Sequence, residues 1–388
     1  MRIGIEGQRL FRPNKHGMDM VALELIRNLQ QIDHDNEYVI FVRPDEDDRV
    51  LTESRNFRIV RLDGGSYPLW EQYALPRAAR KEGCEILHCT SNTAPLFTGI
   101  PLVVTLHDII YLESGYLRIL NGSGTPYQKF GNAYRKLIVP KIVRKSRKII
   151  TVSRFERQRI SSFFGMNGDA RLVSVYNGVS DHFHPVADPA ERARIKSKYR
   201  LPDEFFFFLG NTDPKKNTAG VVKAYSLFIR STGSSIRLVM PDYDRADLDR
   251  IIDGIGDPEL RDRISLTGYI ANADLPAIYS QCSAFLYPSL RESFGIPILE
   301  AMACGAPVVT SNTSSMPEVA GEAASLADPS DPEQIARHME LIVTDTGYRN
   351  RLISLGFQQS ARFSWRSMAR EILHIYHEIK EQTPTTTS

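Results

Sequence analysis

The feature that most constrains the fold is a regular alternation of short apolar runs and helix-length amphipathic segments. In the first half the runs are rich in β-branched and aromatic residues and lie at 2–7, 37–42, 57–62, 85–89, 101–107, 148–153 and 171–176. Segments with helical periodicity, such as VALELIRNLQ and FERQRISSFF, lie between several of them. Strands that are apolar on both faces and are joined by helices predict a parallel sheet in a doubly wound α/β domain.

The alternation pauses at 181–204, a charged stretch with prolines and one short helical pattern, and then restarts. The later runs lie at 204–210, 236–240, 264–268, 284–288, 306–310 and 323–327. We therefore expect one domain over 1–183, a linker over 184–204, a second domain over 205–365 and a final helix over 366–382 that packs back toward the first domain. Because open α/β sheets bind ligands at the carboxyl ends of their strands, two such domains predict a cleft between them.

Composition and charge exclude several classes of protein. The chain has 48 basic and 46 acidic residues among 388, a net charge of +2 (48 − 46), so no basic field indicates nucleic-acid binding. The four cysteines form no C-x-x-C pair and indicate neither a disulfide framework nor a zinc site. The start, MRIGIEGQRL, is typical of a first strand, and no apolar stretch reaches the roughly 18 residues that span a bilayer. We expect a cytoplasmic protein.

The strongest local signal is a pair of carboxylates, Glu292 and Glu300, with SFGIPIL between them. Pro297 suits the first turn of a helix that runs to about Ala303, and Gly295 before it allows a ligand to approach the backbone. The free N–H groups of such a helix start favour an anion such as a diphosphate. A rise of about 1.5 Å per residue puts the carboxylates about 12 Å apart in a helix, whereas glycosidase pairs are about 5 to 9.5 Å apart. The spacing therefore favours a grip on one long ligand over acid/base hydrolysis.

The segment RESFGIPILEAMACG, continued through APVVTSNTSSMPEVAGEAA, closely resembles the donor-binding signature of the retaining glycosyltransferases of family 4. The likeness extends along essentially the whole chain, through HGMDMVALELI, TLHDI, TVSRFER, YNGV, GNTDPKKN and LTGYI. The resemblance implies the α/β GT-B architecture, in which two Rossmann-like doubly wound domains face each other across a cleft. It also implies a nucleotide-sugar donor.

By that resemblance, Glu292 holds the transferred sugar and Glu300 holds the ribose. Backbone amides at and after the Ser-Phe-Gly bind sugar and phosphate, and the base is contacted largely through backbone. The remaining expected donor-binding residues are Ser293, Phe294, Gly295, Ile296, Tyr269 and Ile270.

The loop GNTDPKKN places Lys215 and Lys216 ahead of a helix. A lone lysine pair is common on surfaces, but two cations there are suited to a departing diphosphate. The family has a phosphate-binding lysine at the position of Lys216, so the resemblance favours the functional interpretation. Many members also carry an arginine near Asn211, which this chain lacks, and Lys215 is the expected second cation. The resemblance makes Lys216, Glu292 and His107 the expected catalytic residues.

Several candidates lie in the first half. His107 and Asp108 follow the fifth apolar run, where the resemblance implies that His107 contacts the transferred sugar and Asp108 orients the loop. Arg154 resembles another cleft residue, although a surface helix cation is an equal alternative. The glycine loop at Gly17 is thinner than the glycine-glycine turn usual in the family; Gly17 is expected near the donor phosphate, and Asp19 is a candidate to face the acceptor.

Two other motifs are weaker. Asp242-Tyr243-Asp244 imitates the D-x-D metal motif of the other glycosyltransferase architecture, but DRAD beside it is typical of a helix start. We therefore expect no metal, and no cofactor because the nucleotide-sugar is a substrate. The stretch 134–149 contains seven cations among apolar residues, which is typical both of a solvated helix face and of a segment on an anionic bilayer. Pro140 is expected to interrupt any continuous amphipathic helix there.

The resulting expectation is a retaining, metal-independent hexosyltransferase. Its donor is expected to be GDP-mannose, with UDP-hexoses as the alternative, because PKKN and SNTSSMPEVAGEAA look most like bacterial mannosyltransferases of polysaccharide assembly. The expected acceptor is a glycan or a lipid-linked sugar, met in the cytoplasm or at the inner face of the plasma membrane. The alternatives are a nucleotide-sugar epimerase of the same architecture, which would lack the glutamate pair, and a non-catalytic donor-binding subunit. The acceptor surface is expected to include the loop 111–127.

Overall fold

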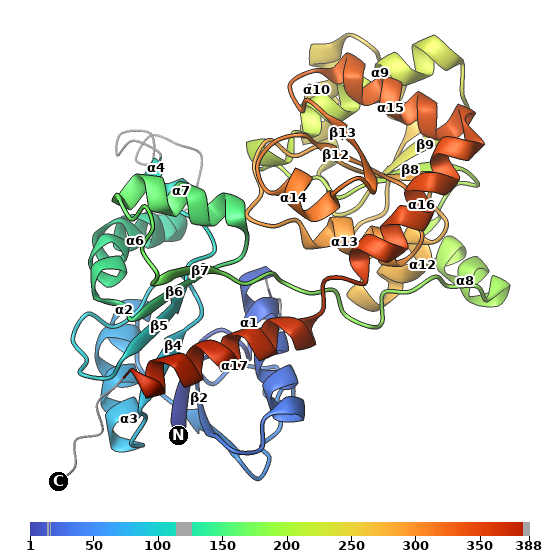
Figure 1. Cartoon of the computed structure of the whole chain (residues 1–388). Helices are drawn as coiled ribbons and strands as arrows, with labels where there is room; N and C mark the ends of the chain where they lie inside the picture. The colour runs from blue at the N-terminus through green and yellow to red at the C-terminus, as the bar shows by residue number, and fades with distance from the viewer. Residues whose placement is uncertain (14, 16, 114–125, 383–388) are drawn as a thin grey trace. The chain divides into compact units, whose positions relative to one another are not determined.

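The computed structural model describes residues 1–13, 15, 17–113 and 126–382, with side chains in the last range from residue 130 on. It forms two compact units (Figure 1): residues 1–177 together with those from Trp365 onward, and residues 178–364. The stretch 184–204 groups with the second unit, where its short helix buries Ile195 and Tyr199. Most of the expected acceptor loop 111–127 lies outside the described residues.

The first unit is built on seven parallel strands in the order β3-β2-β1-β4-β5-β6-β7. They are β1 (Arg2–Glu6), β2 (Glu37–Val42), β3 (Phe57–Arg61), β4 (Ile86–Cys89), β5 (Leu102–Thr105), β6 (Lys148–Thr151) and β7 (Leu172–Ser174). All seven runs predicted in the first half are therefore strands. The central strands β4 and β5 are buried along their whole length, as expected when helices cover both faces.

The helices of this unit are α1 (Gly17–Ile32), α2 (Tyr67–Leu69), η1 (Trp70–Ala74), α3 (Leu75–Lys81), α4 (Ile110–Glu113), α6 (Pro126–Lys145), α7 (Arg154–Phe164) and α17 (Trp365–Glu381). Helix α17, red in Figure 1, lies beside α1, blue, although the two are at opposite ends of the chain. In α17, Tyr376 Oη is 2.6 Å from Nδ1 of the buried His88, and Glu378 Oε2 is 2.8 Å from Lys148 Nζ. The last helix is thus an integral part of the first unit.

Helix α6 corrects one expectation, because it continues through Pro140. Proline lacks the N–H that would bond the carbonyl four residues earlier, at a cost of about 3 kcal/mol or more within a helix. The neighbouring Val139, Ile142 and Val143 are at most 3% exposed and pack in the hydrophobic core of the unit. Burial of these side chains offsets the lost bond, and the expected interruption at Pro140 is wrong.

The second unit has six parallel strands in the order β10-β9-β8-β11-β12-β13. They are β8 (Phe205–Phe208), β9 (Arg237–Met240), β10 (Ile264–Leu266), β11 (Ala284–Tyr287), β12 (Val308–Ser311) and β13 (Ala324–Ala327). All six predicted runs are confirmed. The four consecutive phenylalanines of β8 are fully buried, which requires cover on both faces of the sheet.

Its helices are α8 (Pro189–Tyr199), η2 (Pro214–Lys216), α9 (Thr218–Thr232), α10 (Arg245–Ile255), α11 (Leu260–Arg263), η3 (Asn272–Asp274), α12 (Leu275–Tyr279), α13 (Ile296–Ala303), α14 (Met316–Ala320), α15 (Pro332–Thr344) and α16 (Thr346–Ser360). Strand order reverses between β8 and β11 here, and between β1 and β4 in the first unit. The carboxyl ends of strands beside such a reversal are where α/β sheets bind ligands. These two edges carry the polar side chains described next.

Candidate functional site

A charged cluster of Lys216, Glu292 and Tyr287 lies at the carboxyl edge of the second sheet. Lys216 closes the turn η2 after β8, and Glu292 lies in the loop after β11, so the strand reversal brings them together. Lys216 Nζ is 2.7 Å from Glu292 Oε1, donates to Tyr287 Oη at 2.9 Å and lies 4.8 Å from the ring centre. The Lys216 and Glu292 side chains are 17% and 13% exposed, so a ligand from solvent can reach them.

The loop that carries Glu292 is fastened to two serines that follow β12. The Glu292 N–H donates to Ser314 Oγ at 3.1 Å, and that hydroxyl donates to the Glu292 carbonyl at 2.6 Å. Ser315 Oγ is 2.9 Å from the carbonyls of both Glu292 and Phe294. Ser314 itself has a left-handed backbone, with φ of 61°, which is uncommon for a residue with a side chain. The loop is therefore held by specific side-chain bonds that the sequence reading missed.

Helix α13 begins directly after this loop. Gly295 precedes it with φ of 104°, a conformation that side chains rarely adopt, and an added Cβ would lie 3.1 Å from Ile298 Cδ1. Pro297 is in the first turn, as predicted, where its missing N–H is not needed. The first turn of the helix, next to Glu292, is suited to an anion. The N–H groups of a first turn have no acceptor within the helix, and the positive end of the helix dipole lies there. Ser293 and Ile296 are partly exposed, whereas Phe294 is buried.

Glu300 lies farther along α13, where protein atoms surround its carboxyl although the residue as a whole is partly exposed. Burial raises the pKa of its carboxyl to about 7, although the hydroxyl of the buried Tyr279, 3.4 Å away, opposes that rise. Its charge therefore changes within the physiological range. Of the two expected base contacts after β10, Tyr269 is 72% exposed and Ile270 is buried.

The basic loop is tied to the Glu292 loop by Asn217. This residue has a left-handed backbone, with φ of 59°, and its Nδ2 donates to the carbonyls of Pro288 at 3.0 Å and Pro329 at 2.7 Å. Lys215 is 40% exposed and 3.4 Å from Asp213, and its carbonyl accepts the Leu290 N–H at 2.7 Å. The loop after β8 and the loop after β11 therefore form one bonded structure.

At the carboxyl edge of the first sheet, His107 is almost fully buried, with 5% exposed. The backbone N–H of His107 donates to Asn92 Oδ1 at 2.6 Å, and the ring Nε2 lies 2.9 Å from the carbonyl oxygen of Thr90. A carbonyl can only accept, so Nε2 carries the proton and Nδ1 presents a lone pair. Burial lowers the pKa of His107, which favours this neutral form. A neutral histidine can accept a hydrogen bond from a sugar hydroxyl.

Polar groups that the sequence reading missed surround this edge. Arg9 Nε is 3.0 Å from Asp19 Oδ1, and the Asp19 side chain is 1% exposed. The expectation that Asp19 faces an acceptor is therefore wrong, because Arg9 neutralises it inside the unit. Glu6 is buried at the end of β1, where it accepts the N–H of Thr90 at 3.2 Å. The missed signal was position, because Glu6 ends β1 and Thr90 directly follows β4, and the strand reversal makes these two ends neighbours.

A second buried carboxylate, Glu71, has several donors. It is 1% exposed and accepts from Tyr67 at 2.8 Å, Tyr134 at 2.6 Å, Gln72 at 2.8 Å and also Thr93. Burial raises the pKa of Glu71, while the hydroxyl donors oppose that rise. Side chains of the same unit supply all four of these hydrogen bonds to Glu71, so we interpret the network as a rigid support of the first unit.

The other expected residues of the first unit are placed as follows. Gly17 is the first residue of α1, and an added Cβ there would meet nothing within 4 Å. Asp108 Oδ1 accepts the N–H of Ile110 at 3.2 Å. Arg154 is exposed at the start of α7, which Ser153 caps as expected, and its guanidinium lies 5.8 Å from the Tyr176 ring. The roles of all three stay predictions.

Within the described residues, neither a metal-binding cluster nor a membrane-spanning helix is present. Among residues 1–13, 15, 17–113 and 126–382, no group of three or more His, Cys, Asp or Glu is placed to hold a metal ion. Asp244 of the D-x-D sequence caps α10 by accepting the Asp247 N–H at 3.0 Å, in agreement with the helix start predicted from DRAD. None of the helices so described is long and apolar enough to cross a bilayer.

Comparison with known proteins gives matches in both halves. The family model described as Glycosyltransferase Family 4 matches residues 16–183, and the model Glycosyl transferases group 1 matches residues 190–359. The chain is 34% identical to the O-antigen chain mannosyltransferase B of Escherichia coli over 59% of this chain and 60% of that protein. It is 32% identical to the serotype-specific mannosyltransferase WbdA of the same species over 61% of this chain, but only 29% of that protein. The chain thus covers less than two thirds of either relative.

Solved structures share the fold along nearly the whole chain. A glycosyltransferase from Rickettsia africae superposes with a TM-score of 0.74 at 17% identity, covering 98% of this chain and 99% of the other. HepE of Anabaena in complex with UDP-glucose superposes with a TM-score of 0.70 at 16% identity, covering 97% and 100%. At such identities the likeness concerns the architecture.

Proposed function

Since this chain belongs to the GT-B glycosyltransferases of family 4, we propose that it moves a hexose from a nucleotide-sugar to a glycan or lipid-linked acceptor in the synthesis of a cell-surface polysaccharide or glycoconjugate. The observation that carries the proposal is the solvent-accessible Lys216–Glu292 pair beside the start of α13. A nucleotide-sugar needs a cation for its diphosphate and carboxylates for its hydroxyls. Lys216 supplies the cation, and Glu292 and Glu300 supply the carboxylates, in segments that follow the two strands at the reversal.

GDP-mannose is the favoured donor. The two Escherichia coli relatives are named mannosyltransferases, and a further relative, 24% identical over 68% of this chain, is an O-antigen chain mannosyltransferase of Salmonella typhimurium. UDP-hexoses are the alternative, since HepE of Anabaena holds UDP-glucose in the same architecture.

The ion pair suggests how the donor enters. A diphosphate competes with Glu292 for the ammonium group of Lys216, and Glu292 then turns to the sugar hydroxyls. Lys215, Lys216 and the amides of α13 then neutralise the leaving group, without a metal ion or a cofactor. The bond between the anomeric carbon and the diphosphate oxygen breaks, and the acceptor oxygen bonds to that carbon on the same face. The proton of the acceptor hydroxyl passes to the departing diphosphate, and the anomeric configuration is retained.

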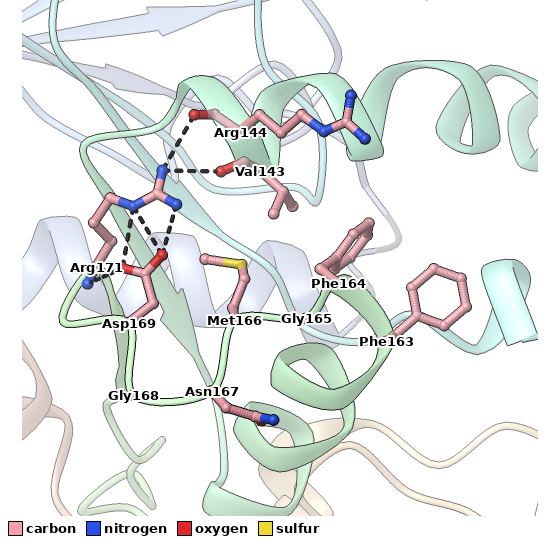
Figure 2. Close-up of a pocket in the computed structure, with 10 residues that line it drawn as sticks. All are labelled: Val143, Arg144, Phe163, Phe164, Gly165, Met166, Asn167, Gly168, Asp169 and Arg171. Atoms are coloured by element: carbon pink, nitrogen blue, oxygen red, sulfur yellow. Dashed lines mark hydrogen bonds and ion pairs between the residues drawn. The ribbon is translucent and has the colours of Figure 1, made fainter.

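We also propose that the enzyme works in the cytoplasm, where 134–149 lies against an anionic bilayer. Leu137 is 59% exposed, and Lys141 and Arg144 are exposed on the same helix. A cavity of about 560 Å³ adjoins the end of α6, and Figure 2 shows Arg144 near it together with Phe163. Cations and exposed apolar groups together favour an interface with anionic lipid.

Donor turnover tests the function. The protein is incubated with GDP-, UDP- and dTDP-sugars, with and without lipid extracts as acceptors, while nucleoside diphosphate release and the identity of the sugar are followed. Release with GDP-mannose is the expected result. A changed sugar without release would favour an epimerase, binding without turnover a non-catalytic subunit, and silence with every donor and acceptor would rule out the transferase.

The bilayer contact is tested by sedimentation with vesicles of phosphatidylglycerol or phosphatidylcholine. We expect the protein to pellet with the anionic vesicles and a Lys141→Glu/Arg144→Glu variant to remain in solution. Equal pelleting of the two proteins would rule out this surface as the contact.

A further inference from the structure

A second strongly basic feature lies along β10, the edge strand of the second sheet, and shares no residue with the Lys216–Glu292 site. It is a groove with a cavity of about 560 Å³, and β10 pairs with β9 at the edge of the described sheet. Its charged lining consists of five cations and one carboxylate: Lys198, Arg200, Arg237, Arg245, Arg261 and Asp262. The groove therefore has a local excess of positive charge that the chain as a whole, at +2, does not.

Two of the cations are neutralised by partners beside the groove. Lys198 Nζ lies 2.6 Å from Asp274, and Arg261 Nε lies 3.3 Å from Asp249. Arg200, Arg237 and Arg245 differ, because none of them is paired with a carboxylate in the part of the chain that the structure describes. Three unpaired guanidinium groups around one cavity repel each other, and an anion between them would remove that repulsion.

Arg237 adds a second observation. One of its terminal nitrogens donates to the carbonyl of Asp262, but its Nε is buried and has no hydrogen-bond partner among the described residues. A buried N–H without an acceptor costs free energy, and a shift of the guanidinium toward an oxyanion bound in the groove would satisfy it. The site thus has an unmet donor as well as unmet charge.

The three arginines come from different elements. Arg200 ends α8 with a left-handed backbone, φ of 51°; Arg237 is the first residue of β9; and Arg245 is the first residue of α10. If these arginines only formed the solvated face of a helix, all three would lie on the same helix. Convergence from three elements on one cavity requires the tertiary fold and is typical of a binding site.

We propose that this groove binds a phosphate-bearing ligand, separately from the donor site. The planar guanidinium fork matches phosphate oxygens in pairs, which makes arginine the residue of choice for phosphate recognition. The volume is in the range of small-molecule sites, about 300 to 1,000 Å³, and fits a sugar phosphate or a nucleotide. The same chemistry belongs to a soluble phosphate ester and to a phospholipid headgroup.

The binding test uses inorganic pyrophosphate and calorimetry. Because pyrophosphate also suits the donor site, the titration is made on the Lys215→Ala/Lys216→Ala protein, in which those cations are removed. Adding Arg200→Ala and Arg245→Ala is expected to weaken the remaining binding at least tenfold. The matched control adds Arg250→Ala and Arg337→Ala, two exposed arginines of the same unit outside the groove, and is expected to change affinity less than twofold.

Loss of the same size in both variants, or no saturable binding to the starting protein, would overturn the proposal. Neither result depends on transferase activity. Sedimentation with phosphatidylglycerol vesicles distinguishes the sources: weaker pelleting of Arg200→Ala/Arg245→Ala than of its control indicates a lipid headgroup. Unchanged pelleting, together with weakened pyrophosphate binding, indicates a soluble phosphate ester.

Discussion

The carboxyl edges of the two sheets use charge in opposite ways. At the first edge, Glu71 and Asp19 are buried and fully engaged by partners within the unit. At the second edge, Lys216 and Glu292 are also paired, but both keep a partly exposed side chain. The first pattern favours one fixed arrangement, whereas the second can be exchanged for a ligand.

The difference follows from how each carboxylate is held. Glu71 accepts four side-chain donors, so breaking its network leaves buried polar groups without partners. Glu292 is held through its backbone by Ser314 and Ser315, and its carboxylate has one cation to release. A backbone anchor with an exchangeable side chain is what a donor site requires.

The largest effect is expected on stability, from loss of the hydrogen-bond network around Glu71. Glu71→Ala removes the acceptor of four donors, of which Thr93 is fully buried, and should lower the free energy of unfolding by about 3 kcal/mol. Urea denaturation checks this, with the exposed Glu46→Ala of the same unit as the control for lost charge. Equal stability of the two variants would break the contrast, because Glu71 would then be no support.

Next comes the exchangeable pair. Lys216→Ala and Glu292→Ala should each slow transfer at least tenfold while folding is retained, because electrostatic stabilisation of the leaving group and the grip on the sugar are lost. The rate of nucleoside diphosphate release measures this. Lys223→Ala, an exposed lysine on α9, is the control. Near-normal kinetics for both site variants would mean that the donor site lies elsewhere.

The protonation of Glu300 sharpens the comparison. With a pKa of about 7, this carboxyl is mostly protonated at pH 6 and mostly ionised at pH 8. Ribose hydroxyls donate to the ionised form, so the donor KM should rise as pH falls, by up to about tenfold between pH 8 and 6. Glu300→Gln cannot ionise and should show a flat KM over that range. A slope that persists in this variant would assign the titration to another group.

The smallest effect is expected at Tyr287. Tyr287→Phe keeps the ring beneath Lys216 but removes the hydroxyl 2.9 Å from its Nζ. One such hydrogen bond is worth about 1 kcal/mol, so kcat/KM should fall about fivefold. Tyr348→Phe, which loses a hydroxyl bonded to Ser325 in the same unit, is the control. Equal kinetics of the two variants would show that the hydroxyl does not position Lys216.

Much of the architecture could be predicted because its signals are local. All thirteen apolar runs contain strands, with ends displaced by at most two residues, since a buried strand is recognised by composition and length. Pro140 was misjudged because a local rule was outweighed by core packing around Val139 and Ile142. Asp19 was misjudged because Arg9, ten residues earlier, pairs with it inside the unit.

The site was predicted in part. The residues at strand ends, such as His107, Lys216 and Glu292, could be singled out because loops after parallel strands carry ligand-binding groups. Tyr287 looked like one more apolar strand residue, and Ser314 like part of a polar turn. Their roles depend on partners 71 and 22 residues away, respectively, which no local pattern indicates.

The sequence by itself therefore determined the alternation of strands and helices, the two halves, and the candidate residues at strand ends, because periodicity and chain position are local properties. The tertiary structure decided which strand ends are neighbours. It thereby decided that Lys216 pairs with Glu292, that Glu300 titrates near pH 7, and that Arg200, Arg237 and Arg245 share a groove. Pairing, desolvation and convergence are set by the order of strands in the sheet and by packing, which join residues far apart in the chain.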